Sequence, residues 1–266
     1  MQKTNTIAVL GAGNMGGAIV NGIIHSGYLQ PNAIRVADPR DKVLKHFSQK
    51  GVHTFSKNTE AAAGSDIVIV AVKPYHIEGV MQDLKPVLNP SAILVSIVTG
   101  IRLKQLESLS SPMQKIVRVM PNTAIAIQQS MTCIAANETG QACLDTVKDL
   151  FDQLGKTIEI GEELMAAATV LASCGTAFAL RYVRAAMQGG IEMGFGAETA
   201  QFITAQTVLG AVELLLNTGN HPEREIDKVT TPRGITITGI NEMEHQGFSS
   251  SVIQGLIASF NKMEQA

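Results

Sequence analysis

Residues 6–17, with the sequence TIAVLGAGNMGG, decide the fold of this chain. A short apolar run leads directly into Gly11, Gly13 and Gly16, which have the spacing G-x-G-x-x-G, and a helical pattern follows. In this setting the first glycine permits a tight turn, the second lets the backbone approach a pyrophosphate, and the third lets helix and strand pack closely. The stretch therefore predicts a dinucleotide-binding turn at the start of a helix, with Asn14 and Met15 completing it.

Outward from this turn, short β-branched runs alternate with longer helical patterns up to about residue 160. Such alternation is typical of a parallel sheet with crossover helices, and the runs without polar alternation indicate strands buried on both faces. The runs expected as strands are 6–10, 33–37, 52–54, 67–71, 92–96, 115–119 and 131–135, and the helical stretches between them are 15–26, 41–50, 58–64 and 140–154.

After residue 161 the sequence is alanine-rich and helical, with long segments at 162–189, 197–217 and 249–263. We therefore predict an α/β protein: a Rossmann-type, mostly parallel sheet domain at 1–160, followed by an all-helical domain for substrate binding and dimerisation at 161–266. Segment 168–188 is apolar on much of its circumference, so we expect other helices to enclose it, a second subunit being one source.

Composition narrows the class of protein. The chain has 266 residues, 45% of them hydrophobic and 17% charged, with a formal net charge of −2, so no basic field favours nucleic acid. Three cysteines and six histidines lie without disulfide or metal-ligand spacing, so no metal is expected. No unbroken apolar run approaches the ~20 residues of a membrane span. A soluble cytoplasmic protein with a small-molecule substrate is expected.

Two residues at the end of the second expected strand give opposite indications about the cofactor. Asp38 lies where an acidic side chain accepts from a ribose hydroxyl, which favours NAD. Arg40 offers a guanidinium to a 2′-phosphate, which favours NADP. A plain turn at 38–40 is the third interpretation. We expect NADP(H) and leave NAD(H) open.

Several further segments follow one another in a telling order: Asn58 before an alanine-rich helix, then Ala71-Val72-Lys73-Pro74, Ser96-Ile97-Val98-Thr99-Gly100, Arg118-Val119-Met120-Pro121-Asn122-Thr123 and, near the end, Asp227-Lys228-Val229-Thr230-Thr231-Pro232-Arg233-Gly234-Ile235-Thr236. With the glycine turn, they resemble the pyrroline-5-carboxylate reductase family through nearly the whole chain. The resemblance implies NAD(P)H-dependent reduction of the cyclic imine 1-pyrroline-5-carboxylate to L-proline, in proline biosynthesis. It also implies homodimers or rings of dimers.

The resemblance also assigns residues. It implies that Asn58 and the turn Val72, Lys73 and Pro74 line the cofactor, with Met120, Pro121 and Asn122 near the nicotinamide. Three departures from the family pattern affect the substrate more than the reaction class: Ala124 replaces a proline, residues 173–177 read SCGTA, and Arg233 replaces a glycine.

The segment at residues 230–236 has the form of a helix start, with a threonine N-cap and Pro232 at the first helical position. Free N–H groups of Arg233, Gly234 and Ile235 would then bind a carboxylate, helped by the hydroxyl of Thr231. Thr236, one turn in, is the candidate catalytic residue, because its hydroxyl can contact the ring nitrogen of the imine. The alternative is a helical threonine that bonds its own backbone.

The expected reaction is inferred from which side chains are absent from the predicted helical segment 166–190. Segment 166–190 contains neither lysine nor histidine, and its two arginines are poor proton donors. Ketone reduction generally uses a positioned acid, whereas hydride transfer to a protonated imine does not. The sequence therefore favours an imine. Two alternatives stay open: a related hydroxyacid dehydrogenase or carbonyl reductase, and a non-catalytic NAD(P)-binding regulator.

Overall fold

The computed structural model describes residues 6–265, and the chain forms two compact units. The first, here called the sheet unit, comprises residues up to Ser173 and a short piece from Met263 onward, and the second, the helical unit, comprises Cys174–Lys262. The outermost ends of the two predicted domains, residues 1–5 and 266, lie outside the described residues. Residues 161–173 pack within the sheet unit, and the functional boundary at 160/161 stays a prediction.

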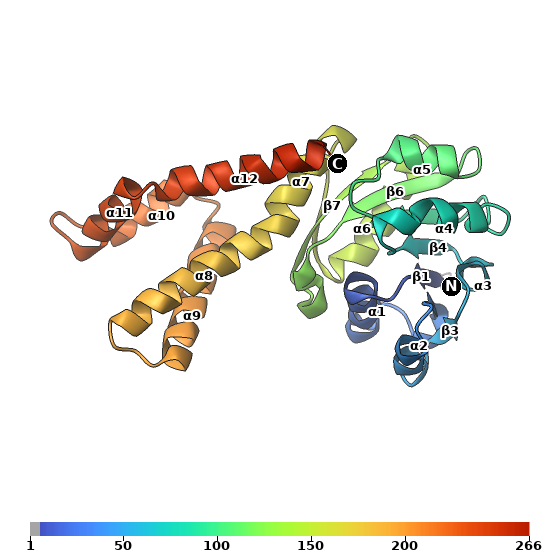
Figure 1. Ribbon diagram of the computed structural model, residues 1–266, viewed down its shortest axis with the longest axis horizontal. Helices are drawn as coiled ribbons and strands as arrows, with labels where there is room; N and C mark the ends of the chain where they lie inside the picture. Colours follow the sequence, from blue (N-terminus) through green and yellow to red (C-terminus); the bar gives the residue numbers. More distant parts are fainter. Residues whose placement is uncertain (1–5, 266) are drawn as a thin grey trace. The chain divides into compact units, whose positions relative to one another are not determined.

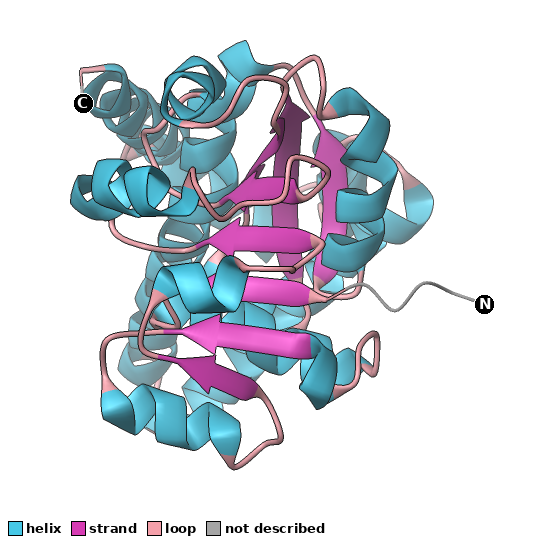
Figure 2. Ribbon diagram, turned by 90° about the vertical axis from the view of Figure 1, so that its right-hand side faces the viewer, coloured by secondary structure: helices cyan, strands magenta, loops and turns pink. Residues whose placement is uncertain are grey.

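The sheet unit is built on one eight-stranded sheet with the order β3-β2-β1-β4-β5-β6-β7-β8 (Figure 2). Neighbouring strands are parallel except β6 and β7, which are antiparallel. This confirms the mostly parallel, Rossmann-type sheet. The strands are β1 (Ile7–Leu10), β2 (Ile34–Ala37), β3 (His53–Phe55), β4 (Ile67–Val70), β5 (Ile93–Ser96), β6 (Lys115–Met120), β7 (Ser130–Ala136) and β8 (Gly155–Glu159).

Helices cover both faces of the sheet (Figures 1 and 2). Along β1, Ile7 and Val9 belong to the core shared with α1, α2 and α6, and Ala8 and Leu10 to the core shared with α3, α4 and α5. Burial on both faces explains why these strands lack polar alternation. The helices are α1 (Asn14–Ser26), α2 (Asp41–Ser48), α3 (Asn58–Ala62), α4 (Ile77–Leu84), α5 (Leu103–Leu109), α6 (Leu144–Asp152) and α7 (Met165–Ala168), which continues into a π-helical turn at Thr169–Cys174.

All seven expected strands form, with shifts of a residue or so at their ends. The sequence did not predict β8, α4 or α5. Strand β8 reads GKTIE and lies at the edge of the sheet, so polar side chains interrupt the apolar run that marks a buried strand. The helix expected over 140–154 begins only at Leu144, after a 3₁₀ turn at Gln141–Cys143.

The helical unit contains α8 (Gly175–Glu192), α9 (Ala197–Thr218), α10 (Pro222–Val229), α11 (Ile235–His245) and most of α12 (Phe248–Glu264). Helices α8 and α9 approach closely where Gly190 lies beside Ala200: a Cβ added to Gly190 would lie 3.1 Å from the Cβ of Ala200. Helices α8 and α12 meet through the rings of Tyr182 and Phe248, whose centroids are 6.3 Å apart.

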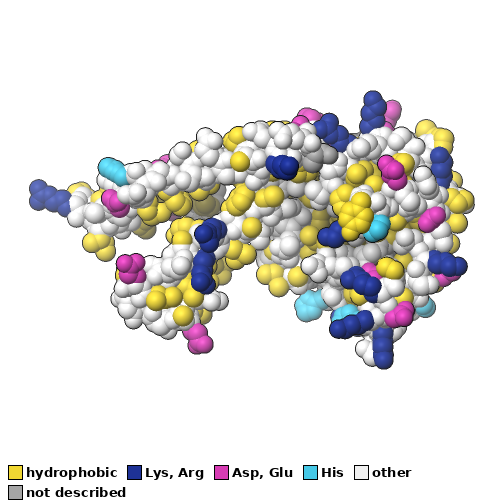
Figure 3. Space-filling model, viewed as in Figure 1, with side chains coloured by type: hydrophobic (Ala, Val, Ile, Leu, Met, Phe, Trp, Pro, Cys, Tyr) yellow, Lys and Arg dark blue, Asp and Glu magenta, His cyan; other side chains and the backbone are white. Residues whose placement is uncertain are grey.

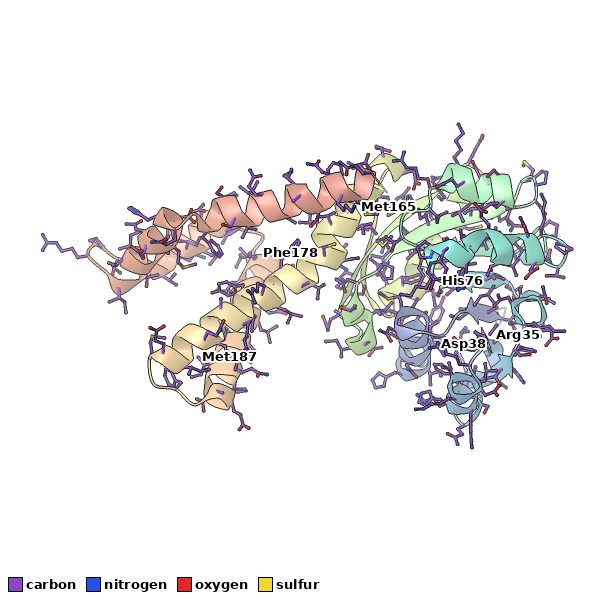
Figure 4. The ribbon with its side chains drawn as sticks, in the orientation of Figure 1. Arg35, Asp38, His76, Met165, Phe178 and Met187 are labelled. Atoms are coloured by element: carbon purple, nitrogen blue, oxygen red, sulfur yellow. The ribbon has the colours of Figure 1, made fainter. Side chains whose placement is uncertain are left out.

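The helical unit buries almost none of its apolar surface within one chain. Of residues 175–262, only Gly190 and Ala200 are buried, while Phe202 and Leu216 are 72% and 75% exposed. Apolar side chains lie along these helices in Figure 3, and Figure 4 marks Phe178 and Met187 on α8. Helices of the same unit therefore do not enclose segment 168–188 as was expected. Exposed apolar side chains in this number are typical of an interface.

Two helical stretches, Glu162–Glu192 and Ala197–Thr218, are long and apolar enough to cross a bilayer by length and composition alone. Neither stretch is an unbroken apolar run, because glycine, threonine and other small or polar residues interrupt it without lowering the mean hydropathy much. Core helices of soluble proteins pass the same test, so length and composition are weak grounds for a membrane span.

Candidate cofactor and active site

A cavity of about 700 Å³ lies at the carboxyl ends of the parallel strands of the sheet unit. Residues that directly follow β1, β2, β4, β5 and β6 meet there, as expected at the edge of a parallel sheet where the strand order reverses. The lining residues are Gly11, Gly13, Asn14, Met15, Asp38, Pro39, Arg40, Ala71, Val72, Lys73, Pro74, Tyr75, His76, Ile97, Thr99, Met120, Pro121, Asn122, Thr123, Thr169 and Ser173.

The glycine turn brings backbone close to backbone. Gly11 has a φ of +90°, and a Cβ there would lie 2.8 Å from the carbonyl oxygen of Ala71. A Cβ on Gly16 would lie 2.0 Å from the carbonyl oxygen of Gly11, so no larger residue fits without moving the turn. At Gly13 the nearest such atom is Nη2 of Arg40, 3.9 Å away, so the missing side chain there leaves space on the cavity side.

Helix α1 starts at this turn with its N–H groups available to a ligand. Its N-cap, Gly13, has no side chain to accept from them, and its first turn contains no acidic residue. An uncapped helix start binds an anion through these N–H groups and the positive end of the helix dipole. The turn, the space beside Gly13 and the uncapped helix together fit a pyrophosphate.

Asp38 is fixed in place behind this turn. The side chain is 3% exposed, and its Oδ2 accepts from the backbone N–H of Ala12 at 2.9 Å. Arg40 donates to the same carboxylate through Nε, at 2.7 Å, and through Nη2, at 2.8 Å. Burial alone would raise the pKa of Asp38, but the hydrogen bonds from Arg40 and Ala12 outweigh burial and lower the pKa below its usual value. The carboxylate therefore stays charged, in a bidentate ion pair.

Hydrogen bonds also fix the end of β6. The side chain of Asn122 accepts from the N–H of Ala124 at 3.0 Å and donates to the carbonyl of Ala172 at 3.2 Å. Ser173 donates its hydroxyl to the carbonyl of Pro121 at 2.9 Å. These contacts join the strand end to the π-helical turn, which places Thr169 and Ser173 on the cavity wall. Single π-helical turns are frequent at functional sites.

Twelve of the fourteen residues predicted to bind cofactor line this cavity. The exceptions are Gly16, which packs behind the turn, and Asn58, which begins α3 and does not line it. The lining residues that the sequence did not predict include two groups of different origin. Tyr75 and His76 follow Pro74 in the same 3₁₀ turn, so their position could have been read from the strand end. Thr169 and Ser173 come from a distant segment, and only tertiary packing places them there.

The structure corrects the expected helix start at Pro232. Helix α10 ends at Val229, and α11 begins at Ile235 with Gly234 as its N-cap. Arg233 has a φ of +62°, and the N–H of Gly234 donates to the carbonyl of Thr231 at 2.8 Å. A bond from the fourth residue to the first, with positive φ at the third, is a type II turn, in which proline is common at the second position. Pro232 therefore starts a turn, and not a helix.

This turn changes which amides are free. Of the three N–H groups predicted to be free, that of Gly234 is used inside the turn, whereas those of Arg233 and Ile235 bond no described residue. The N–H of Thr236, at the start of α11, is unpaired as well. Thr236 is exposed, and its hydroxyl bonds no other described residue. Thr238 instead donates to the carbonyl of Gly234 at 3.2 Å, which is the backbone bond that was the alternative for Thr236.

Three side chains in the cavity are of types that act as general acids: Lys73, Tyr75 and His76. None of them belongs to segment 166–190, whose lack of lysine and histidine favoured an imine over a ketone. Among residues 6–265, no three His, Cys, Asp or Glu side chains form a group that could hold a metal ion.

A mostly parallel sheet whose glycine turn opens onto such a cavity defines the dinucleotide-binding class of proteins. Residues 6–100 match the family model for NADP oxidoreductases, coenzyme F420-dependent, and residues 162–266 match the model for pyrroline-5-carboxylate reductase dimerisation. The chain belongs to the pyrroline-5-carboxylate reductase family, and it carries the dimerisation domain of that family.

Individual relatives agree with this membership. Pyrroline-5-carboxylate reductase 2 of Dictyostelium discoideum is 38% identical, over 100% of this chain and 94% of the relative. Pyrroline-5-carboxylate reductase 1 of the same organism is 41% identical over 97% of this chain, which spans only 49% of that longer relative. The crystal structure of pyrroline carboxylate reductase from Plasmodium falciparum with NADP bound superposes with a TM-score of 0.88 at 26% identity, covering 100% of this chain and 99% of the other.

Proposed function

We propose that this protein reduces 1-pyrroline-5-carboxylate to L-proline with NAD(P)H, as a step of proline biosynthesis. The observation that carries the proposal is the pairing of a full-length family match with a cavity that a dinucleotide fits. That cavity runs from the glycine turn to the end of β6. NADP is also the molecule bound in the Plasmodium relative.

The sheet unit binds the cofactor in this proposal. The amides at Gly13, Asn14 and Met15 hold the pyrophosphate at the start of α1, with Lys73 as a cation at the cavity wall. Met120, Pro121 and Asn122 would border the nicotinamide, and the hydrogen bonds of Pro121 and Asn122 to the π-helical turn hold that wall in place. The reduced nicotinamide supplies a hydride.

The segment at residues 230–236 binds the substrate. Its turn and the start of α11 offer amides of Ile235 and Thr236 to the carboxylate, and Thr231 and Gly234 shape the turn. Arg233, exposed in the turn, adds positive charge beside the anionic ring. Thr236 orients the ring nitrogen with its hydroxyl. The nitrogen lone pair becomes an N–H by uptake of one proton from water, and the imine carbon receives the hydride.

The helical unit assembles the protein into a homodimer, or a ring of dimers, in the cytoplasm. Within one chain the helical unit has no hydrophobic core, because only Gly190 and Ala200 are buried in residues 175–262. A second copy of the chain buries its exposed apolar side chains. The apolar helices α8 and α9 therefore pack against protein, and not against lipid.

Initial rates of NADPH oxidation test the activity. We expect turnover with 1-pyrroline-5-carboxylate and formation of proline, identified by chromatography. A panel of small 2-keto acids forms the control, because Lys73, Tyr75 and His76 are the groups that would favour a hydroxyacid dehydrogenase. Turnover of keto acids in preference to the imine would refute the proposal, and cofactor binding without turnover of either would favour a regulator.

A further inference from the structure

A single carboxylate oxygen joins three segments of the sheet unit. Oε1 of Glu162 accepts from Nη1 of Arg118 at 2.8 Å and from the backbone N–H of Leu103 at 2.9 Å. Arg118 belongs to β6, Leu103 is the first residue of α5, and Glu162 begins the 3₁₀ turn that leads into α7. The side chains of Arg118 and Glu162 are 4% and 28% exposed, so the ion pair lies largely inside the sheet unit.

Each of these three segments carries part of the wall of the cavity described above. The wall residues lie between β5 and α5, at the end of β6, and in the π-helical turn after α7: Ile97, Thr99, Met120, Pro121, Asn122, Thr169 and Ser173. Neither Arg118 nor Glu162 lines the cavity. The pair can therefore influence a bound ligand only through the position of the wall.

Segment 162–173 is attached to β6 and its end at two places. Arg118 holds the first residue of the segment, and its last two residues are held by the hydrogen bonds to Pro121 and Asn122. Met120, which the proposed function places at the nicotinamide, lies between the two attachments along the chain. The ion pair therefore helps to set where the π-helical turn meets the end of β6.

Stability does not explain why this position holds an ion pair. Taking two ions out of water costs free energy, and Nε of Arg118 and Oε2 of Glu162 are buried without a hydrogen-bond partner among the described residues. Ile116 and Met120, which share a face of β6 with Arg118, belong to an apolar core that an apolar side chain would continue. Replacing a buried ion pair by apolar groups is often neutral or stabilising.

We propose that Arg118 and Glu162 are positioning residues for the reaction, which hold the end of β6 and the π-helical turn in the arrangement that hydride transfer requires. The inference rests on the proposed use of a nicotinamide cofactor and goes beyond it, because neither residue lines the cavity. The amides at the start of α1 do not depend on this pair. Its loss should therefore change where the nicotinamide lies more than how tightly the dinucleotide binds.

A double variant that removes both charges together separates positioning from stability. In Arg118→Met combined with Glu162→Gln no unpaired charge is buried, and the glutamine Oε1 can still accept from the N–H of Leu103. Thermal unfolding checks folding, and titration gives the Kd of NADPH. The fluorescence lifetime of bound NADPH reports on how the nicotinamide is held, without any imine. Steady-state kinetics then give kcat and the KM for 1-pyrroline-5-carboxylate.

The matched control removes the ion pair of α6, by Lys148→Met combined with Asp152→Asn. Asp152 also accepts from a backbone N–H, that of Thr157, and neither partner lines the cavity. The same kind of change is thereby made in the sheet unit without a link to the cavity wall. We expect this control to keep the lifetime and the kcat of the unmodified protein.

We expect the Arg118–Glu162 double variant to unfold within a few degrees of the unmodified protein. The Kd of NADPH and the KM for the imine should change by less than about threefold. The fluorescence lifetime of bound NADPH should shorten towards that of free NADPH. The kcat should fall about tenfold or more, because a small misplacement of the reacting atoms slows the transfer.

A double variant with the lifetime and kcat of the unmodified protein would overturn the proposal, and so would one whose kcat falls no further than that of the control. If the double variant folds poorly, Glu162→Gln alone decides, because it keeps an acceptor for both donors. It should shorten the lifetime and lower kcat about threefold, and unchanged values would overturn the proposal.

The two proposals can fail separately. A shortened lifetime in the double variant of a protein that reduces no imine would refute the proposed function alone. Turnover of the imine at an unchanged rate, with an unchanged lifetime in the double variant, would refute the positioning role alone.

Discussion

The three glycines of the turn after β1 differ in what surrounds them. Gly11 and Gly16 face backbone atoms, at 2.8 Å and 2.0 Å from an added Cβ, whereas Gly13 faces the cavity and the end of the Arg40 side chain. The first two are therefore required by the fold of the turn, and Gly13 is required by the ligand.

A pair of alanine substitutions separates these roles. Gly16→Ala should lower the free energy of unfolding by about 1–3 kcal/mol, because its Cβ meets the carbonyl of Gly11, and cofactor binding should fall with it. Gly13→Ala should cost less than Gly16→Ala, about 1 kcal/mol or below as an alanine at an N-cap, yet bind NADPH about tenfold or more weakly. Thermal unfolding and fluorescence titration measure the two effects. Equal thermal stability of the two variants would contradict this account.

The ion pair of Asp38 predicts a pH dependence of stability. Because the folded state lowers the pKa of Asp38, its contribution is fully present above the pKa of the unfolded chain and is lost as the pH falls through the lower folded value. Asp38→Asn should therefore have a lower melting temperature than the unmodified protein at pH 7. This difference in melting temperature should shrink as the pH falls below the usual pKa of aspartate. Asp41→Asn, which changes an exposed neighbour, serves as control. A difference that stayed constant down to acid pH would be inconsistent with this pair.

Thr236 and Thr238 form a matched pair in the first turns of α11. Thr236→Ala should lower the turnover number about tenfold or more and leave the Kd of NADPH unchanged, because its hydroxyl is proposed to contact only the substrate. Thr238→Ala should change neither, since that hydroxyl bonds the backbone of its own helix. Steady-state kinetics and cofactor titration distinguish the cases. Equal loss of turnover and of cofactor affinity in Thr236→Ala would rule out the assigned role.

At the scale of elements, the sequence predicts best where one physical cause decides the structure. The strands of the sheet are buried on both faces, so continuous apolar runs mark them, and the residues after them meet at one edge. Asp38 was assigned to the cavity on this ground, whereas Val72 and Asn122, which also follow strands, were assigned through the family resemblance.

Prediction fails where two local signals compete or where contacts are remote. Thr231 and Pro232 can start a helix or a type II turn, and the left-handed conformation of Arg233 decides for the turn. The π-helical turn that carries Thr169 and Ser173 has no signature of its own, because its hydrogen bonds to residues 121–122 join segments about fifty residues apart.

The crossing of α8 and α9 depends on one small residue. Gly190→Leu should lower the melting temperature by several degrees, because even a Cβ at this position lies 3.1 Å from Ala200. Gly189→Ala, where an added Cβ meets nothing within 4 Å, should be neutral or slightly stabilising, since alanine favours a helix over glycine. Thermal unfolding compares the two. A neutral Gly190→Leu would mean that the helices are free to separate at this point.

For the whole molecule, the exposed apolar helices predict self-association. Light scattering should give at least a dimer at micromolar concentration, without detergent. A paired substitution of exposed apolar residues, Phe202→Glu with Leu209→Glu, should yield smaller species that lose thermal stability. A monomer in the unmodified protein would contradict the proposed assembly, and so would partition into lipid vesicles in preference to the aqueous phase.

The central claim, that a nicotinamide delivers its hydride to a cyclic imine in this protein, is tested most directly by isotope transfer. NADPH with deuterium at both C4 positions is used with 1-pyrroline-5-carboxylate as substrate. The proline formed should be heavier by one deuterium. That deuterium should lie on the ring carbon that adjoins nitrogen and does not carry the carboxylate. Proline without deuterium, or deuterium recovered only in a hydroxyacid from the keto-acid control, would contradict it.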